Sequence, residues 1–208
     1  METRPPQPVW LRLAPWAGIA FAVLFVAGFV ISGTTPDYDE AAEWQEWLND
    51  SGNRQGAWVG GLIMVVGAFA LLWFSQALAW RLKSDANPLA QIASSSAVVM
   101  VTMLLTAVFF GVAVPVSIEV ADAPVPSSDI AIQFEQVAFG FLLVGTCFAG
   151  ALYIATTTTL ARGTWPSWMV WVSYGAAVLL LFGPLFFPMV ALPLWALLTG
   201  IYLLRRPL

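Results

Sequence analysis

The sequence contains no histidine and only one cysteine, Cys147. Without histidine the chain cannot hold haem through an imidazole, form a Ser-His-Asp triad or a Cys-His nucleophile, or build a zinc site that needs imidazole. A single cysteine also excludes a disulfide within the chain. No P-loop and no G-x-G-x-x-G motif occurs. We therefore predict neither a cofactor nor a metal, and we expect Cys147 to be an ordinary buried small residue.

Charge is the second scarce feature. Charged residues make up 10% of the 208 residues and hydrophobic residues 60%, whereas a soluble domain is about 25% charged. The net charge of −4 and the lack of a basic face argue against nucleic-acid binding. The uncharged runs cover 13–36, 55–80, 86–118, 136–161 and 163–204. This pattern predicts an all-α transmembrane helix bundle in which 1–208 form a single domain.

The lengths of these runs predict the number of membrane spans. A helix needs about 20 apolar residues to cross a hydrocarbon core of about 30 Å. The last run is about twice that length, and we expect it to fold back at 183-GPLFFP-188 because glycine and proline interrupt helices. The six predicted spans are about 13–32, 57–80, 90–116, 136–160, 166–183 and 187–204.

Two details concern the ends of these spans. The first run is expected to be a true span and not a cleaved signal peptide, because it has full spanning length and 30-VISGTTP-36 lacks a good cleavage site. Pro115, near the end of the third span, is expected to terminate its helix.

The basic residues predict the orientation in the membrane. With six spans and a cytoplasmic N-terminus, all Lys and Arg residues except Arg54 face the cytoplasm: Arg4, Arg12, Arg81, Lys83, Arg162, Arg205 and Arg206. The positive-inside rule therefore predicts a multi-pass protein of the cell membrane with both termini in the cytoplasm. Ten of the twelve acidic residues then lie outside, in the loops 33–55 and 117–135.

The outer segment 37-DYDEAAEWQEWLND-50 predicts a short amphipathic helix, about 37–51, on the outer face. At about 100° per residue, its acids form one stripe and its aromatic and aliphatic residues occupy the other side. Asp37 and Glu40 are expected to form a capping box, and Gly52 to stop the helix. We expect the aromatic side to lie among lipid headgroups and the acids in water.

Two functional alternatives exist for this stripe. A cation site is disfavoured because oxygens in a row on one helix do not converge as Ca²⁺ requires. Contact with a basic partner is the other alternative. The candidate partner surface consists of Asp39, Glu43, Trp44, Glu46, Trp47 and Asp50.

Uncharged polar residues gather toward the predicted cytoplasmic ends of the spans. The candidate polar cavity is formed by Ser75, Gln76, Gln91, Ser95, Thr157, Ser173 and Tyr174. One interpretation is a cytoplasm-facing cavity for a small polar solute or a lipid headgroup. The other is helix packing, in which such side chains hydrogen-bond between helices. Small residues four apart, such as Gly56 and Gly60, also predict close helix packing.

No Asp, Glu, Lys, Arg or His residue falls within the six predicted spans. A charge at the bilayer centre costs at least about 2.5–3.5 kcal/mol, so ion-coupled transport and proton relays are not expected. An enzyme would have to use the outer carboxylates Glu119, Asp122, Asp129 and Glu135. A carboxylate drawn deep among the helices would bring ion-coupled mechanisms back.

Three short motifs accompany the first, fifth and sixth spans: 16-WAG-18, 165-WPSWMVWVSYG-175 and 193-PLWALLTG-200. In these motifs, and in the acidic outer loop after the first span, the chain resembles a broad group of six-span bacterial membrane proteins, often actinobacterial, that is classed as a domain of unknown function. The resemblance implies six spans and supplies no catalytic or binding residues.

These observations predict a non-enzymatic membrane protein. The leading hypothesis is an accessory, regulatory or structural subunit that acts through contacts with membrane lipid, with another membrane protein or with a second copy of the chain. The alternative is a carrier or channel for a small neutral solute or lipid that uses the polar cavity described above.

Overall fold

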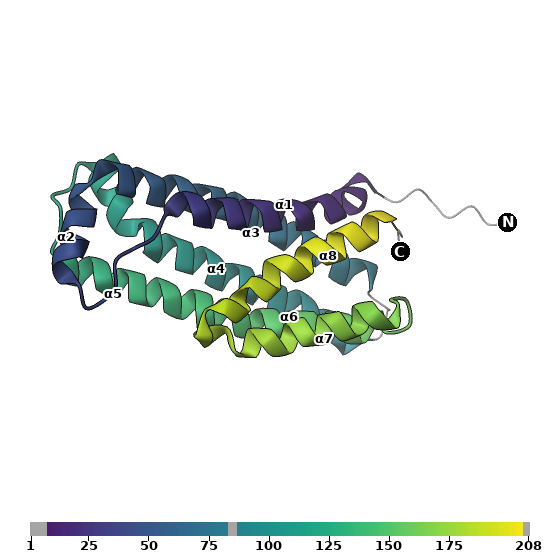
Figure 1. Cartoon of the computed structure of the whole chain (residues 1–208). Helices are drawn as coiled ribbons and strands as arrows, with labels where there is room; N and C mark the ends of the chain where they lie inside the picture. Colours follow the sequence, from purple (N-terminus) through teal and green to yellow (C-terminus); the bar gives the residue numbers. More distant parts are fainter. Residues whose placement is uncertain (1–7, 83–86, 206–208) are drawn as a thin grey trace.

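The computed structural model describes residues 8–82 and 87–205, and within these ranges the chain is helical apart from short connections. The predicted all-α class is confirmed. The long helices are α1 (Val9–Ser32), α3 (Ser51–Arg81), α4 (Pro88–Ala121) and a continuous helix built from α5 (Ser128–Phe139), the π-helical segment η1 (Gly140–Thr146) and α6 (Cys147–Ala161). The short helix α2 (Ala41–Asn49) lies across one end of the bundle, and α7 (Ser167–Leu181) and α8 (Ala191–Arg205) form a hairpin (Figure 1).

Within the described ranges, five helices are long and apolar enough to cross a membrane: Val9–Ser32, Ser51–Arg81, Pro88–Ala121, Ser128–Ala161 and Phe187–Arg205. They indicate a multi-pass membrane protein. Helix α7 is also apolar but has only 15 residues. Such a helix is roughly 22 Å long, which is shorter than the hydrocarbon core of about 30 Å.

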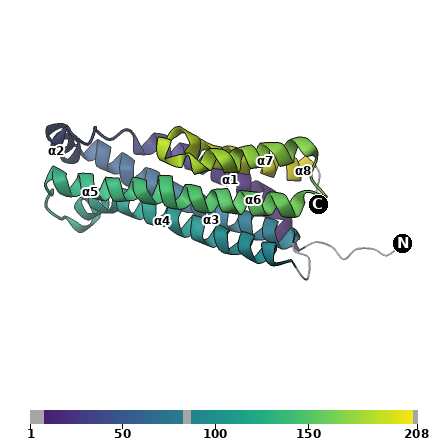
Figure 2. The ribbon, with the colours of Figure 1, turned by 90° about the horizontal axis from the view of Figure 1, so that it is seen from below.

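The two ends of the bundle differ. Helix α1 begins and α8 ends at the same end, whereas α2 lies at the opposite end (Figures 1 and 2). Helix α1 packs against α3 and α8, α4 packs against α3 and α6, and α7 packs against α6. The tip of the α7–α8 hairpin reaches only part of the way toward α2 (Figure 1).

Helices α1 and α3 cross at close range. A Cβ added at Gly60 would lie 2.5 Å from the carbonyl oxygen of Gly28, and one added at Gly28 would lie 2.7 Å from that of Gly60. Real Cβ atoms do not approach backbone oxygen so closely, so only glycine allows this crossing. The close packing predicted from Gly56 and Gly60 is confirmed, since a Cβ at Gly56 would also lie 2.9 Å from the Ile31 carbonyl oxygen.

Buried aromatic residues join three helices in the core of the other half of the bundle. The Trp195 ring of α8 lies 6.0 Å from Phe74 of α3 and 5.7 Å from Tyr153 of α6, measured between ring centroids. The indole Nε1 of Trp195 donates to Ser173 Oγ of α7 at 2.9 Å. Edge-to-face packing with a satisfied indole is a favourable way to bury these large rings.

Several predicted helix ends differ from the structure. Pro115 does not terminate its helix, because α4 continues to Ala121 with Pro115 inside it; neighbouring helices in a bundle can accommodate such a proline. The capping box is wrong as well: α2 begins at Ala41, and Glu40 makes no side-chain capping bond. Gly52 does not stop a helix either. Instead Asp50 caps α3 by accepting a hydrogen bond from the Gly52 backbone N–H at 2.7 Å.

The predicted fold-back at 183-GPLFFP-188 is confirmed, because two 3₁₀ turns, η2 (Gly183–Leu185) and η3 (Phe187–Val190), separate α7 from α8. Helix α5 begins at Ser128, eight residues before the predicted start of the fourth span. The basic residues Arg4, Lys83 and Arg206 lie outside the described residues.

Candidate functional site

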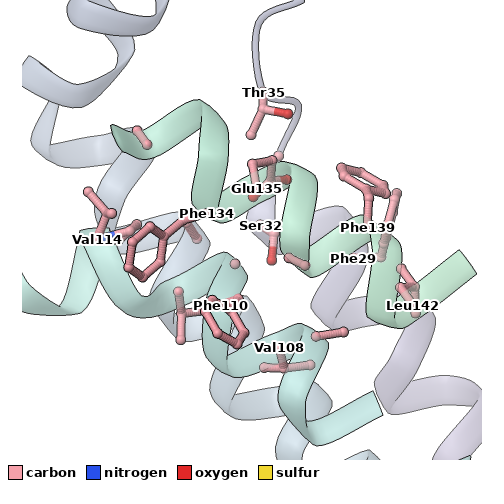
Figure 3. A pocket seen from close by; sticks show the side chains of 18 of the residues that line it. Phe29, Ser32, Thr35, Val108, Phe110, Val114, Phe134, Glu135, Phe139 and Leu142 are labelled. Carbon is pink, nitrogen blue, oxygen red and sulfur yellow. The ribbon is translucent and has the colours of Figure 1, made fainter. Parts of the chain in front are cut away.

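A cavity of about 390 Å³ lies at the α2 end of the bundle. Seven aromatic side chains line it, and we call it the aromatic cavity: Phe29, Trp44, Trp47, Phe110, Phe134, Phe139 and Phe186. Its remaining walls are mostly small or aliphatic residues from α3, α4 and α5, together with Ser32 and the linker residues Gly33, Thr34 and Thr35. Figure 3 shows Phe29, Phe110, Phe134 and Phe139 converging from different helices around one space, with Glu135 and Ser32 between them.

The cavity exists because the α7–α8 hairpin is short. Beside this hairpin, α1 packs on α8 and α6 packs on α7. Beyond the hairpin tip at 183–190, α1 and α5 lie apart, and the linker 33–40 crosses between them (Figure 1). Gly33 starts this linker with φ of 73°, a backbone conformation that favours glycine. The linker and α2 therefore cover a space that no helix fills.

Helix α2 closes the end of the cavity with its aromatic side. Trp44 is 2% exposed and Trp47 9% exposed, and both pack with Leu48 against residues of α3, α4 and α5. The indole Nε1 of Trp44 donates to the Asp37 carbonyl oxygen at 3.1 Å and so ties the linker to α2. These tryptophans therefore face the bundle. The exposed part of the predicted partner surface consists of Asp39, Glu43, Glu46 and Asp50.

Glu135 is the only ionisable residue among those that line the cavity. It lies about two turns inside α5, because this helix begins at Ser128. A Cβ placed at Gly111 of α4 would lie 3.8 Å from Glu135 Oε2, so the carboxylate lies level with Gly111. Glu119 lies near the end of α4, beside α2. Along the α4 axis, Gly111 lies about 12 Å from Glu119 toward the middle of the bundle. The carboxylate is therefore drawn among the helices, away from the other acids.

Arg54, the arginine at this end of the bundle, is paired with Glu119 and not with Glu135. Arg54 Nη2 lies 2.6 Å from Glu119 Oε1, and this is the only ion pair within residues 8–82 and 87–205. The same guanidinium donates from Nη1 to the Leu48 carbonyl oxygen. The carboxyl group of Glu135 therefore has no cationic partner in the described part of the chain.

The pKa of Tyr38, in the linker, depends in part on the charge of Glu135. Its ring lies 6.5 Å from that of Phe139 in an edge-to-face arrangement. Partial burial and, second to it, the negative charge of Glu135 together raise the pKa of Tyr38 to about 12. The phenol is consequently a hydrogen-bond donor at neutral pH, close to the rim of the cavity.

Phe186 forms the wall at the hairpin tip and has a strained backbone. Its φ of 68° and ψ of −62° form a tight turn that residues with a Cβ rarely adopt. Its ring lies 6.1 Å from Phe29 and 6.0 Å from Phe139. Strain of this kind costs roughly 1–3 kcal/mol and tends to occur at ligand clamps and switch regions.

Close packing holds the hairpin tip in place. A Cβ at Gly183 would lie 2.5 Å from the Leu143 carbonyl oxygen and 2.6 Å from Cys147 Cβ, so only glycine fits against η1. Segments of π-helix such as η1 often occur at functional sites. The position of Phe186 therefore depends on how this tip fits the π-helical segment.

The candidate polar-cavity residues are placed in several separate environments. Gln76 Nε2 donates to the Ser94 carbonyl oxygen at 3.2 Å, and Ser94 Oγ donates to Gln76 Oε1 at 2.6 Å, which joins α3 to α4. The Tyr153 hydroxyl donates to the Ser75 carbonyl oxygen at 3.3 Å, joining α6 to α3. These bonds connect neighbouring helices.

The remaining members are equally dispersed. Ser173 accepts from Trp195 at 2.9 Å, and Tyr174 shares a hydrogen bond of 2.9 Å with Thr159. Thr157 is fully buried, and its hydroxyl has no partner within the described ranges. Gln91 and Ser95 line an open groove between α4 and α6. Most of these residues thus bond between helices, Gln91 and Ser95 line a separate groove, and none of the seven lines the aromatic cavity.

The four outer carboxylates lie in different environments. Glu119 is paired with Arg54, Asp122 and Asp129 are exposed, and only Glu135 reaches the cavity. In the part of the chain that the structure describes, no three Asp, Glu, Cys or His residues form a group that could hold a metal ion.

A helical pattern in the sequence contained a signal for this site that our predictions missed. Ala131, Glu135, Ala138 and Leu142 follow one another at spacings of four, three and four residues. Such spacing places side chains on one face of a helix, and all four line the cavity. The predicted span began at 136 and so left Glu135 in a loop.

Comparisons with protein-family models, curated proteins and solved structures found no match. The resemblance to six-span bacterial membrane proteins therefore stays a prediction. Function resides in sites and not in folds, and the aromatic cavity is the candidate functional site of this chain.

Proposed function

We propose that this protein binds one amphipathic molecule, a lipid or a lipid-like compound, which enters the aromatic cavity from the surrounding bilayer. The observation that carries the proposal is the cavity itself, whose volume of about 390 Å³ lies within the range of about 300–1,000 Å³ typical of small-molecule sites. Its walls are apolar and aromatic, with a few polar groups on one side. This composition suits a molecule with a large apolar body and a small polar group.

The proposed topology has six membrane segments, with both ends of the chain in the cytoplasm and α2 outside. Four described arginines support it, because they lie on segments at the end where α1 begins and α8 ends: Arg12, Arg81, Arg162 and Arg205. Arg54, at the α2 end, is neutralised by Glu119. This distribution agrees with the positive-inside rule. In the proposed topology the aromatic cavity lies in the outer half of the membrane.

The α7–α8 hairpin supports entry from the bilayer. Its tip exposes large apolar side chains, including Leu185 at 69% and Phe187 at 84%. No charged residue occurs between 163 and 204. Such a tip is stable in lipid and costly in water, so we place it within the apolar layer. Phe186, which lines the cavity, then lies beside residues that contact lipid, and a molecule can pass from the acyl-chain region to the cavity without entering water.

The test is to identify what the protein carries when it is purified from native membranes in a mild maltoside detergent. Bound molecules are extracted and quantified by mass spectrometry for the wild type and for Gly111→Leu. A Cβ at position 111 has ordinary contacts of 3.7 and 3.8 Å, so leucine there extends into the cavity without breaking the helix. Gly175→Leu is the matched control, because a Cβ at Gly175 meets no atom within 4 Å and this residue is exposed on α7.

We expect one amphipathic compound at close to one molecule per chain on the wild type and on Gly175→Leu, and its loss on Gly111→Leu. The same compounds at the same ratio on all three proteins would contradict the proposal, because the cavity would then not be the binding site. Thermal unfolding of each variant shows whether the bundle remains folded.

A second candidate function is contact with a basic partner, as in the accessory-subunit hypothesis. The observation that favours it is the acidic side of α2, where Asp39, Glu43, Glu46 and Asp50 are all exposed while the aromatic side is buried. Replacing Glu43 and Glu46 with lysine should release proteins that co-purify with the wild type from native membranes. Purification of the wild type reproducibly alone would argue against this function.

A further inference from the structure

We infer that the molecule in the aromatic cavity is an organic cation, a lipid-like amine or quaternary ammonium compound whose positive group is bound by Glu135. This inference rests on the proposed function, because it specifies the chemistry of the same occupant. It follows from three features of the cavity: an unpaired carboxylate, aromatic walls and the lack of further metal-binding oxygens.

The carboxylate is the first feature. Glu135 is the one ionisable residue lining the cavity, and the nearby Arg54 is already paired with Glu119. A charge at membrane depth is expensive and is therefore treated as functional by default, with its partner to be named. No partner of opposite charge is found in the described ranges. A cationic occupant would supply the missing charge, whereas an anionic occupant would be repelled.

The aromatic walls are the second feature. Glu135 lies on α5 between Phe134 and Phe139, and the Phe139 ring lies 6.0 Å from that of Phe186. On the other side, Phe134 lies 5.6 Å from Phe110. Aromatic faces attract cations electrostatically, and cages of such rings recognise quaternary ammonium groups in other proteins. A carboxylate placed between phenylalanines therefore favours a soft organic cation.

The small number of oxygen ligands is the third feature, and it argues against an inorganic ion. Ca²⁺ needs six to eight converging oxygens, but the side chains that line the cavity offer only one carboxylate and the hydroxyls of Ser32, Thr34 and Thr35. The hydroxyl of Ser32 is buried and has no hydrogen-bond partner within residues 8–82 and 87–205. It is thus free to accept a hydrogen bond from a protonated amine, or to turn its oxygen toward a quaternary ammonium group, which has no N–H to donate, while the apolar walls hold a hydrocarbon chain.

The test compares three radiolabelled probes that share an eight-carbon chain: octyltrimethylammonium, octanol and octanoate. Their binding to the full-length protein in maltoside micelles is measured by equilibrium dialysis at moderate salt. The variants are Glu135→Gln, which removes the charge and keeps the shape, and Gly111→Leu, which fills the cavity. Glu43→Gln is the matched control for net charge, because Glu43 is exposed on α2.

We expect the wild type and Glu43→Gln to bind octyltrimethylammonium more tightly than octanol, and octanoate least. Glu135→Gln should lose about tenfold or more in affinity for the cation, because a desolvated charge pair is broken, and should keep its affinity for octanol. Gly111→Leu should lose both the cation and octanol.

Other outcomes separate the two proposals. Equal binding of cation and octanol to the wild type, with both lost on Gly111→Leu, would overturn the cationic ligand and leave the cavity as a binding site for neutral amphiphiles. Tighter binding of octanoate would also overturn it. If no probe binds, or if Gly111→Leu binds all probes like the wild type, the proposed function itself is wrong.

Discussion

Arg54 of α3 and Glu119 of α4 form an ion pair of 2.6 Å between residues that are 65 positions apart in the sequence. Both side chains are largely buried, at 11% and 18% exposure. Because Arg54 also donates to the Leu48 carbonyl oxygen of α2, one guanidinium fixes three helices relative to each other. This arrangement holds α2, and with it Trp44 and Trp47, over the end of the aromatic cavity.

Breaking this pair should destabilise the bundle at the α2 end. In Arg54→Ala the Glu119 carboxylate stays largely buried without a partner, and we expect a loss of about 1–3 kcal/mol in stability. The measurement is thermal unfolding in detergent micelles. Arg54→Ala combined with Glu119→Ala should cost less than the sum of the two single changes, because neither charge is then left unpaired. Strict additivity would show that the pair contributes no coupling.

The α1–α3 crossing gives a steric prediction. Gly60→Ala should lower the unfolding temperature clearly, because its Cβ would lie 2.5 Å from the Gly28 carbonyl oxygen and the helices must move apart. Gly175→Ala is the matched control, since its Cβ meets nothing within 4 Å. It should raise stability slightly, by up to about 1 kcal/mol, because alanine favours helix over glycine. Similar unfolding temperatures for the two variants would contradict the close crossing.

The strained turn at Phe186 predicts an unusual order of stability. With φ at 68°, alanine carries the same backbone strain as phenylalanine, whereas glycine does not. Phe186→Gly should therefore be more stable than Phe186→Ala by about 1–2 kcal/mol. Both variants lose the same aromatic ring, so their comparison isolates the backbone. Thermal unfolding measures the difference, and a more stable alanine variant would show that this conformation is not adopted.

The helical architecture could be predicted from the sequence, because helices that cross a membrane need long runs of uncharged, mostly apolar residues. Uncharged runs and 183-GPLFFP-188 predicted where the long helices and the fold-back lie, and the structure agrees. Helix ends were harder to predict, because they depend on which side chain or backbone group caps the last free N–H and C=O groups. Asp50 caps α3 through the Gly52 backbone N–H, and this contact overrides the stop that Gly52 alone suggested.

The candidate site was predicted less well for a physical reason. From the sequence, the inner polar residues were compatible with a cavity or with helix packing, and in the structure Gln76 bonds to Ser94 and Ser173 bonds to Trp195. The aromatic cavity arises instead from a hairpin that is shorter than its neighbours, and such a mismatch in length is a property of the tertiary structure. In the sequence, the spacing of Ala131, Glu135, Ala138 and Leu142 was the one indication of a helix face lining this cavity.

The charge at Glu135 should be visible in the titration of Tyr38. The pKa of Tyr38 is about 12 in the folded protein, and it is about 10 in an unfolded chain. Because the folded pKa is the higher one, Tyr38 contributes stability that is fully present below about pH 10 and is lost as the pH rises toward 12. Tyr38→Phe should reduce this alkaline loss of stability.

Glu135→Gln should lower the pKa of Tyr38, because it removes a nearby negative charge. Ultraviolet absorbance of the phenolate measures this shift in pKa. An unchanged Tyr38 titration would show that Glu135 lies too far away to interact with Tyr38.

The proposed topology can be tested by labelling single thiols in whole cells. The native Cys147 is buried, at 2% exposure, so it should react little. A membrane-impermeant maleimide should label Asp39→Cys in intact cells, because we place the linker before α2 outside. It should label Arg162→Cys only after the cells are opened, because we place the loop between α6 and α7 in the cytoplasm. Leu185→Cys should react poorly in both cases, since thiolate formation and reagent access both need water and we place the hairpin tip in the apolar layer. Rapid labelling of Leu185→Cys from outside would instead put the tip in water, and the cavity would then be filled from the aqueous phase and not from the bilayer.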